Sequence, residues 1–187
     1  MRFKSVDELE HFKFQDAQIT SFQDESEHLK LELEAVVVRG RHPLNETYTD
    51  RYADTVMMRL MGGRIVEAFK EGYKYYDANN VLKEEVADEE MSEADFGKLS
   101  KICKDGHIFV LETPHSLKEK LGEQFPCQME QYMDVNPTQE SNADSQIVIM
   151  AVDVDSEEEE REYTYWMAIR YEKAILEWEH MMNKPDA

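Results

Sequence analysis

Two carboxylates stand where they could hold a metal ion. Asp153 and Asp155 end an apolar run that begins at Gln146, so both side chains project from one face of a strand, with Glu157 nearby. Carboxylate oxygens are the ligands that Ca²⁺ and Mg²⁺ prefer. The segment lacks the glycine and the closing glutamate of a calcium-binding loop. We therefore predict no metal site and no cofactor, and keep Asp153 and Asp155 only as candidate ligands in an alternative function, a divalent-cation hydrolase.

Asp16 is a carboxylate among aromatic residues. It lies in "FKFQDAQITSF" (12–22), where the strand-like alternation changes parity at Gln15 and Asp16. An inserted residue of this kind indicates a β-bulge, and the carboxylate could accept hydrogen bonds from N–H groups that the bulge leaves unpaired. A catalytic carboxylate needs a second acid or a histidine within reach, which no spacing here supplies. We predict a structural role for Asp16.

Other residue types that catalyse reactions occur in no recognisable arrangement. The six histidines form no HxH, HxxxH or HExxH pattern, and no GxSxG turn is present. Gly62 and Gly63 lack the remaining residues of a phosphate-binding loop. Cys103 and Cys127 lack CxxC spacing and are expected to be buried free thiols. The sequence predicts no catalytic residue and favours a protein that is not an enzyme.

The chain is strongly acidic, with 41 Asp and Glu residues against 21 Lys and Arg and a formal charge of −20. Such a charge repels phosphate backbones and anionic lipid headgroups and attracts cationic proteins. We therefore predict no nucleic acid and no membrane as partner, and a basic protein instead. The acidic residues are concentrated in 83–95 and 153–162. The candidate partner-binding residues are Glu84, Glu85, Asp88, Glu89, Glu90, Glu157, Glu158, Glu159 and Glu160.

The amino-terminal "MRFKSVDELEHF" has acidic residues within its first ten positions and no apolar core of a secretion signal. No apolar stretch approaches the ~18 residues that a membrane span needs. We expect a cytoplasmic protein.

The methionines and the large aromatic residues are spread over many elements. We expect the methionines to fill the core. Five aromatic residues are expected at the core and its rim rather than in a ligand cage, namely Trp166, Trp178, Tyr73, Tyr75 and Tyr76.

Alternating apolar and polar residues predict strands over much of the chain. The predicted strands are 12–22, 28–38, 107–112, 127–135 and 146–154, with a hairpin over 72–86. Ser5 and Glu8 form a capping-box pattern that indicates a helical turn before the first strand. The main helix is predicted from Ser92 to Cys103, and "SLKEKLG" (116–122) indicates a further helical turn.

Two segments fit both a helix and a strand. Residues 55–69 carry apolar residues at both spacings, and we favour two strands because Gly62 and Gly63 interrupt either element. Residues 163–182 are predicted as a strand to about Tyr171, followed by a second short strand or helical turn that carries Trp178.

These elements predict an α+β fold that is mainly β. We expect an antiparallel sheet or sandwich built from hairpins, with one main helix packed on it. At 187 residues the chain is expected to form a single globular domain, 1–187, with the last few residues disordered.

"HFKFQDAQITSF" followed by "LKLELEAVVV" resembles the opening of small, strand-rich bacterial cytosolic domains related to toxin-immunity proteins. "KEGYKYYDANNVLKEEV" and "YEKAILEWEHM" are similar to segments of the same uncharacterised group. The resemblance implies a noncatalytic binding role and supplies no active site. The predicted function is therefore a noncatalytic acidic protein of the cytosol, an immunity-type or regulatory protein that binds a basic partner protein.

Overall fold

The computed structural model describes residues 1–133 and 145–183. Strands dominate this part of the chain, so the predicted α+β, mainly β fold is confirmed. The predicted disorder of the last few residues concerns positions that lie outside the described ones. The strands are β1 (Phe3–Val6), β2 (Phe12–Lys13), β3 (Gln18–Asp24), β4 (His28–Glu34), β5 (Val37–Val38), β6 (Arg51–Ala53), β7 (Val56–Met61), β8 (Arg64–Lys70), β9 (Tyr73–Tyr76), β10 (Leu82–Val86), β11 (Glu89–Glu90), β12 (His107–Glu112), β13 (Gln146–Ser156), β14 (Arg161–Tyr171), β15 (Lys173–Trp178) and β16 (Met181–Asn183). The helices are α1 (Leu99–Ile102) and α2 (Pro114–Leu121), with the 3-10 helices η1 (Leu9–His11), η2 (Glu93–Lys98), η3 (Gly122–Gln124) and η4 (Cys127–Tyr132).

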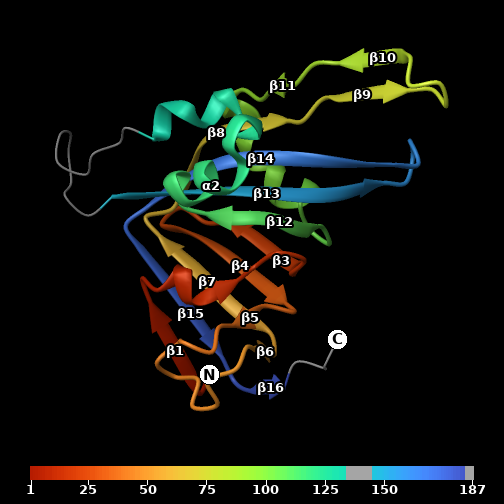
Figure 1. Ribbon diagram of the computed structural model, residues 1–187. Coiled ribbons are helices and arrows are strands. Elements are labelled where there is room, and N and C mark those ends of the chain that lie inside the picture. The colour runs from red at the N-terminus through yellow and green to blue at the C-terminus, as the bar shows by residue number, and fades with distance from the viewer. Residues whose placement is uncertain (134–144, 184–187) are drawn as a thin grey trace.

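A large antiparallel sheet organises the described residues. Its ten strands follow the order β1-β15-β7-β4-β3-β12-β13-β14-β8-β11. The chain passes from β7 to β8 across Gly62 and Gly63, and from β14 to β15 across Glu172. The two halves of the sheet are therefore joined by continuous chain as well as by the pairing of β3 with β12 (Figure 1). This arrangement curls the sheet so that one face encloses the main core, which draws on β4, β7, β13 and β14 together.

Burial on both faces explains the composition of β13. Val148, Met150 and Val152 point into the main core, whereas Ile149 and Ala151 belong to a second core on the outer face. Leu117 of α2 and Met129 of η4 are buried in this second core, so helices cover this face of the sheet. The strand predicted at 146–154 is confirmed, and it lies inside the sheet between β12 and β14. Because both faces of this strand are buried over 147–152, none of these positions faces solvent, and the sequence is apolar at consecutive residues.

Four adjacent strands of the large sheet each break once and continue into a smaller one. The small sheet has the order β16-β6-β5-β2, which matches the order β15-β7-β4-β3 in the large sheet. The breaks fall at 14–17, 35–36, 54–55 and 179–180. At two of them Asp16 and Ala35 adopt positive φ angles, of 66° and 62°. At the other two, the Asp54 carboxylate accepts hydrogen bonds from the Glu179 N–H and from the His180 ring.

The breaks correct two predictions. The strand predicted over 12–22 is two strands in different sheets, because the bulge expected at Gln15 and Asp16 is a complete change of sheet. The strand predicted over 28–38 likewise ends at Glu34, and Ala35 after it is exposed. A single parity change in the sequence does not distinguish a bulge from a corner between sheets.

Most other element predictions are confirmed. Residues 55–69 form β7 and β8, and residues 163–182 are covered by β14, β15 and the start of β16. The hairpin over 72–86, the strands at 107–112 and 146–154 and the helical turn after Pro114 are also present.

Three local predictions are wrong in part or in full. The helical turn predicted before Phe12 is present as η1, but Ser5 does not cap it, because Ser5 belongs to β1 and its hydroxyl donates to the Glu8 carboxylate. The main helix predicted from Ser92 is the 3-10 helix η2 followed by the single turn α1, and Gly97 within η2 weakens the α-helix there. Residues 127–132, predicted as strand, form η4, which packs Met129 onto the outer face of the sheet.

The corner at Gly63 generates a stability prediction. A Cβ atom there would lie 2.4 Å from the Leu60 carbonyl oxygen, whereas a Cβ on Gly97 would meet nothing within 4 Å. We expect Gly63→Ala to lower the free energy of unfolding by about 1–3 kcal/mol, as overpacking does. Gly97→Ala should leave it unchanged or raise it slightly. Urea unfolding followed by circular dichroism measures both, and equal stability of the two variants would contradict the close approach at this corner.

Candidate functional site

All nine candidate partner-binding carboxylates are exposed. Glu84 and Glu85 lie on β10, Asp88 follows it, Glu89 and Glu90 form β11, and Glu157 to Glu160 form the turn between β13 and β14. Strands β9 and β10 pair only with each other, as a two-stranded sheet separate from the others. Figure 1 shows this hairpin projecting beyond the body of the molecule, on the same side as the β13–β14 turn.

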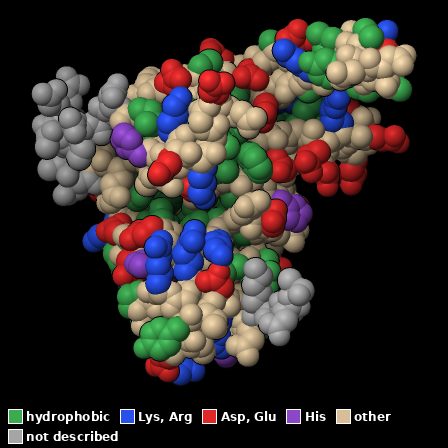
Figure 2. All heavy atoms as spheres, viewed as in Figure 1, with side chains coloured by type: hydrophobic (Ala, Val, Ile, Leu, Met, Phe, Trp, Pro, Cys, Tyr) green, Lys and Arg blue, Asp and Glu red, His purple; other side chains and the backbone are tan. Residues whose placement is uncertain are grey.

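The structure brings the two acidic segments together. The Arg161 guanidinium, at the end of the β13–β14 turn, lies 3.3 Å from the centre of the Tyr73 ring on β9. Burial raises the pKa of Tyr165, and one glutamate from each segment, Glu89 and Glu159, is among the charges that raise it further. Asp and Glu side chains accordingly gather on this side of the molecule (Figure 2). We call this region the acidic face, defined by the nine carboxylates.

Three members of the acidic face already have partners. Asp88 accepts hydrogen bonds from the Gly72 N–H and the Gln128 amide, both at 2.8 Å, and so ties the base of the hairpin to the body. Glu85 forms a 3.3 Å ion pair with Lys74, and Glu84 accepts a hydrogen bond from the Tyr73 hydroxyl. Within the described residues, no ion pair or side-chain hydrogen bond engages the other six, which are Glu89, Glu90, Glu157, Glu158, Glu159 and Glu160.

The hairpin also exposes apolar side chains that sequence reasoning missed. Tyr75, Tyr76, Val81, Leu82 and Val86 expose between 42% and 54% of their surface. Cross-strand pairing sets Tyr76 beside Leu82 on one face, and alternation places Tyr75 and Val86 on the other. The sequence placed Tyr75 and Tyr76 at the core or its rim, because alternation does not show whether a second layer covers a hairpin. We call these five residues the hairpin patch.

Asp153 and Asp155 are not assembled into a metal site. Asp153 accepts a 2.6 Å hydrogen bond from the Thr164 hydroxyl across the β13–β14 pair, and Asp155 is exposed. Throughout residues 1–133 and 145–183, no group of three His, Cys, Asp or Glu side chains is placed to hold a metal ion. The geometry gives the hydrolase alternative no support.

Asp16 marks the change of sheet. It is exposed, and in the described structure its carboxylate has no hydrogen-bond partner. Its backbone N–H donates to the Ile108 carbonyl oxygen at 2.8 Å, which fixes the corner against β12. The predicted hydrogen bonds to the carboxylate are therefore absent, and the residue suits the corner because aspartate tolerates positive φ better than most residues.

A cluster of the buried residues Ser5 and His42 with the half-buried Glu8 also escaped sequence reasoning. The His42 Nδ1 atom accepts a hydrogen bond from the Leu44 N–H at 3.0 Å, so the proton resides on Nε2. Nε2 lies 3.2 Å from the Ser5 hydroxyl, which donates to Glu8. The histidine therefore donates to the serine and cannot act as its base, and Ser5 is only 2% exposed. The cluster is a chain of hydrogen bonds that joins the loop at His42 to β1.

The two cysteines differ in exposure. Cys103 is buried as predicted, and burial raises the pKa of its thiol to about 12, which leaves it unreactive. Cys127 is exposed, so the prediction of a buried thiol is wrong there. Both are free thiols.

No protein-family model, curated protein or solved structure matches this chain. The resemblance to immunity-type domains therefore stays a prediction. Among the described helices, none is long and apolar enough to cross a membrane.

The His42 cluster generates a pH prediction. Burial lowers the pKa of His42. The negative charge of Glu8 partly offsets this decrease, and the nearby His11 adds to it. The neutral ring therefore stabilises the fold above the unfolded pKa of about 6.5, and this contribution is lost as pH falls through the lower folded pKa. We expect the free energy of unfolding to fall more steeply between pH 7.5 and 5.5 in the native protein than in His42→Gln, by at most about 1.4 kcal/mol per pH unit.

Urea titrations at several pH values measure the two slopes. His115→Gln, which removes an exposed imidazole on α2, is the control and should keep the native slope. Equal slopes in the native protein and His42→Gln would show that His42 is not held neutral.

Proposed function

We propose that this chain is a noncatalytic, cytoplasmic binding protein that uses the β9–β10 hairpin and the acidic face to engage a basic partner protein. The observation that carries the proposal is the hairpin patch. A two-stranded hairpin is at best marginally stable by itself, and exposed apolar groups are a feature of interaction sites. On the hairpin both faces carry such groups, whereas most of the large apolar side chains elsewhere in the described residues are enclosed in two cores.

The charge around the patch specifies the partner's chemistry. Interfaces commonly combine an apolar centre with a polar rim. Here the rim contains six carboxylates without a partner in the described structure, from Glu89 to Glu160 along the chain. A cationic protein would relieve their mutual repulsion, and the negative potential would steer it toward the hairpin. A nucleic acid or an anionic membrane would be repelled by the same charges.

An immunity-type role is one form of this function, in which the acidic face covers the cationic active site of a toxin. Only the sequence resemblance favours that form over a regulatory role. The hydrolase alternative has no observation in its favour and is not proposed.

The acidic face is expected to control the rate of association with the partner. The tagged protein is incubated in a lysate of its own cells, and any basic protein that it retains is identified and purified. We expect the variant with Glu157 to Glu160 changed to Gln to associate with that protein about tenfold more slowly at low salt, since rim charges act mainly on the on-rate. The dissociation rate should change little.

The matched control changes four exposed glutamates elsewhere, Glu27, Glu46, Glu119 and Glu123, to Gln. It alters the net charge equally and should leave the association rate near that of the native protein. If the lysate yields no basic protein, or if the control slows association as much as the Glu157 to Glu160 variant, the proposal is wrong.

The second prediction concerns the dissociation rate. Tyr76 supplies an exposed ring at the end of β9, and exposed aromatic residues dominate many interfaces. We expect Tyr76→Ser to weaken binding by about 2 kcal/mol, chiefly through faster dissociation. Tyr48→Ser is the control, because Tyr48 is 87% exposed and lies far along the chain from the hairpin. Surface plasmon resonance measures both variants, and equal dissociation rates would exclude the hairpin as the contact.

A further inference from the structure

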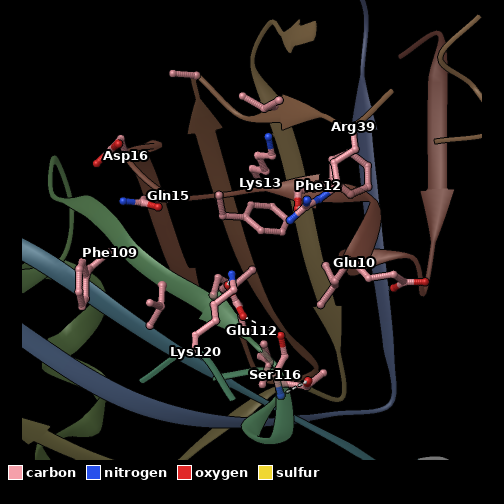
Figure 3. Close-up of a pocket in the computed structure, with 18 of the residues that line it drawn as sticks. Glu10, Phe12, Lys13, Gln15, Asp16, Arg39, Phe109, Glu112, Ser116 and Lys120 are labelled. Carbon is pink, nitrogen blue, oxygen red and sulfur yellow. Dashed lines mark hydrogen bonds and ion pairs between the residues drawn. The ribbon is translucent and has the colours of Figure 1, made fainter. Parts of the chain in front are cut away.

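The large sheet opens between β3 and β12. These strands share one register pair, Gln18 with His107, and the Ile108 backbone still bonds to the chain at Asp16 and Ala17. Beyond Ile108, no described strand pairs with this edge of β12. The opening contains a cavity of about 890 Å³, bounded also by the breaks at 14–17 and 35–36 and by α2 (Figure 3). We call it the central pocket.

Aromatic and aliphatic side chains line much of the central pocket. Phe12 and Phe14 are buried beside it, and Val148 and Tyr171 line it from β13 and β14. Phe109 is the extra residue of a bulge in β12, and its ring stays 40% exposed at the pocket. Bulges often redirect a side chain beside a binding site.

Four cationic side chains also line the central pocket, although the protein as a whole is strongly acidic. Lys13 is paired with Asp50, and Lys120 with Glu112. Arg39 and Arg41 differ, because in the described structure neither forms an ion pair. Figure 2 shows Lys and Arg side chains gathered next to recessed hydrophobic ones in the middle of this face.

Backbone carbonyls hold the two arginines in place. Arg39 Nε donates to the Phe12 carbonyl oxygen at 3.2 Å, and an Arg41 terminal nitrogen donates to the Glu10 carbonyl oxygen at 3.1 Å. A guanidinium has five N–H donors, so each arginine retains donors for a further acceptor. Carbonyl oxygens fix the orientation of the guanidinium without neutralising its charge. Each arginine is therefore oriented by one backbone hydrogen bond and keeps donors that an anion can accept from.

Four carboxylates also line the central pocket, namely Asp7, Glu10, Asp16 and Glu112. Two of them have partners of their own. Asp7 accepts a hydrogen bond from the Ala174 N–H at 2.7 Å, and Glu112 is bound by Lys120 and Ser116. In Figure 3, Asp16 lies at the end of the pocket opposite Glu10, and Arg39 lies on the same side of the view as Glu10.

We propose that the central pocket binds a small amphipathic organic anion, a carboxylate or phosphate head group on an apolar body. The head group is bound by Arg39 and Arg41, and the body packs against Phe12, Phe14 and Phe109. The volume of about 890 Å³ lies within the roughly 300–1,000 Å³ of small-molecule sites. This site does not depend on the proposed protein-binding function, because its residues are separate from the hairpin patch and the acidic face.

Isothermal titration calorimetry tests the site with defined probes below their micelle concentrations. The probes are dodecanoate, dodecyl phosphate and, as the cationic control, dodecyltrimethylammonium. We expect one dodecanoate or one dodecyl phosphate to bind per chain and the cation to fail. The anion that binds more tightly identifies the head group. A short peptide that ends in Phe with a free carboxylate tests the unpaired edge of β12 as a peptide site.

Matched variants locate the binding. The Arg39→Gln/Arg41→Gln variant should weaken binding of the anion about tenfold or more, because it removes charge-assisted hydrogen bonds. Arg64→Gln removes an exposed arginine on β8, away from the pocket, and should bind as the native protein does. If the double variant melts early, Arg41→Gln alone takes its place, since this side chain is exposed. Phe109→Ser should weaken binding through loss of apolar contact.

The proposal is wrong if neither anion binds, if the cation binds as tightly as the anions, or if the arginine variant binds the anion with the affinity of the native protein. Binding of the peptide without either small anion would also reject the small-molecule assignment.

Discussion

The long pairing of β13 with β14 is the interaction on which the rest of the structure depends. Eleven register pairs join the two strands, from Gln146 and Tyr171 to Ser156 and Arg161. Cores on both faces fix this ribbon, since adjacent residues belong alternately to the main core and to the second core. Slippage by one residue would exchange the two sets of side chains, which makes the register strongly specified. The paired strands therefore hold the segments at their two ends in fixed positions relative to each other.

The two candidate sites lie at opposite ends of that ribbon. One end carries Glu157 to Glu160, which the turn presents next to the β9–β10 hairpin. The other end contributes Gln146, Val148 and Tyr171 to the central pocket. The hairpin meets the turn through Arg161 and Tyr73, and its base is tied to the body by the bond between Asp88 and Gln128 and by the pairing of β11 with β8.

Charge is distributed unequally between the two sites. Six carboxylates of the acidic face form no ion pair in the described structure. Arg39 and Arg41 of the central pocket also form none there. The hydrogen bond from Lys13 and, to a smaller extent, the charge of Arg39 lower the pKa of Asp50. In the pocket, the backbone carbonyl oxygens of Phe12 and Glu10 accept hydrogen bonds from the two guanidinium groups. Those carbonyls are available because β2 and η1 leave the large sheet, so the same breaks that bend the strands also create the cationic site.

The sequence by itself determined the fold class, most of the strands and the position of the acidic segments. Alternation at Leu29, Leu31 and Leu33 and unbroken apolarity from Ile147 to Val152 are local patterns, and local patterns suffice to predict a strand and its burial. Sequence alone did not show the change of sheet at Asp16 and Ala35 or the exposure of Tyr75 and Tyr76. Nor did it show that Arg39, Arg41 and Phe109 line one pocket. Only the tertiary structure decided these features, because each depends on which segments distant in the chain pair or fail to pair, and hydrogen bonding between distant strands leaves no periodic trace in either strand.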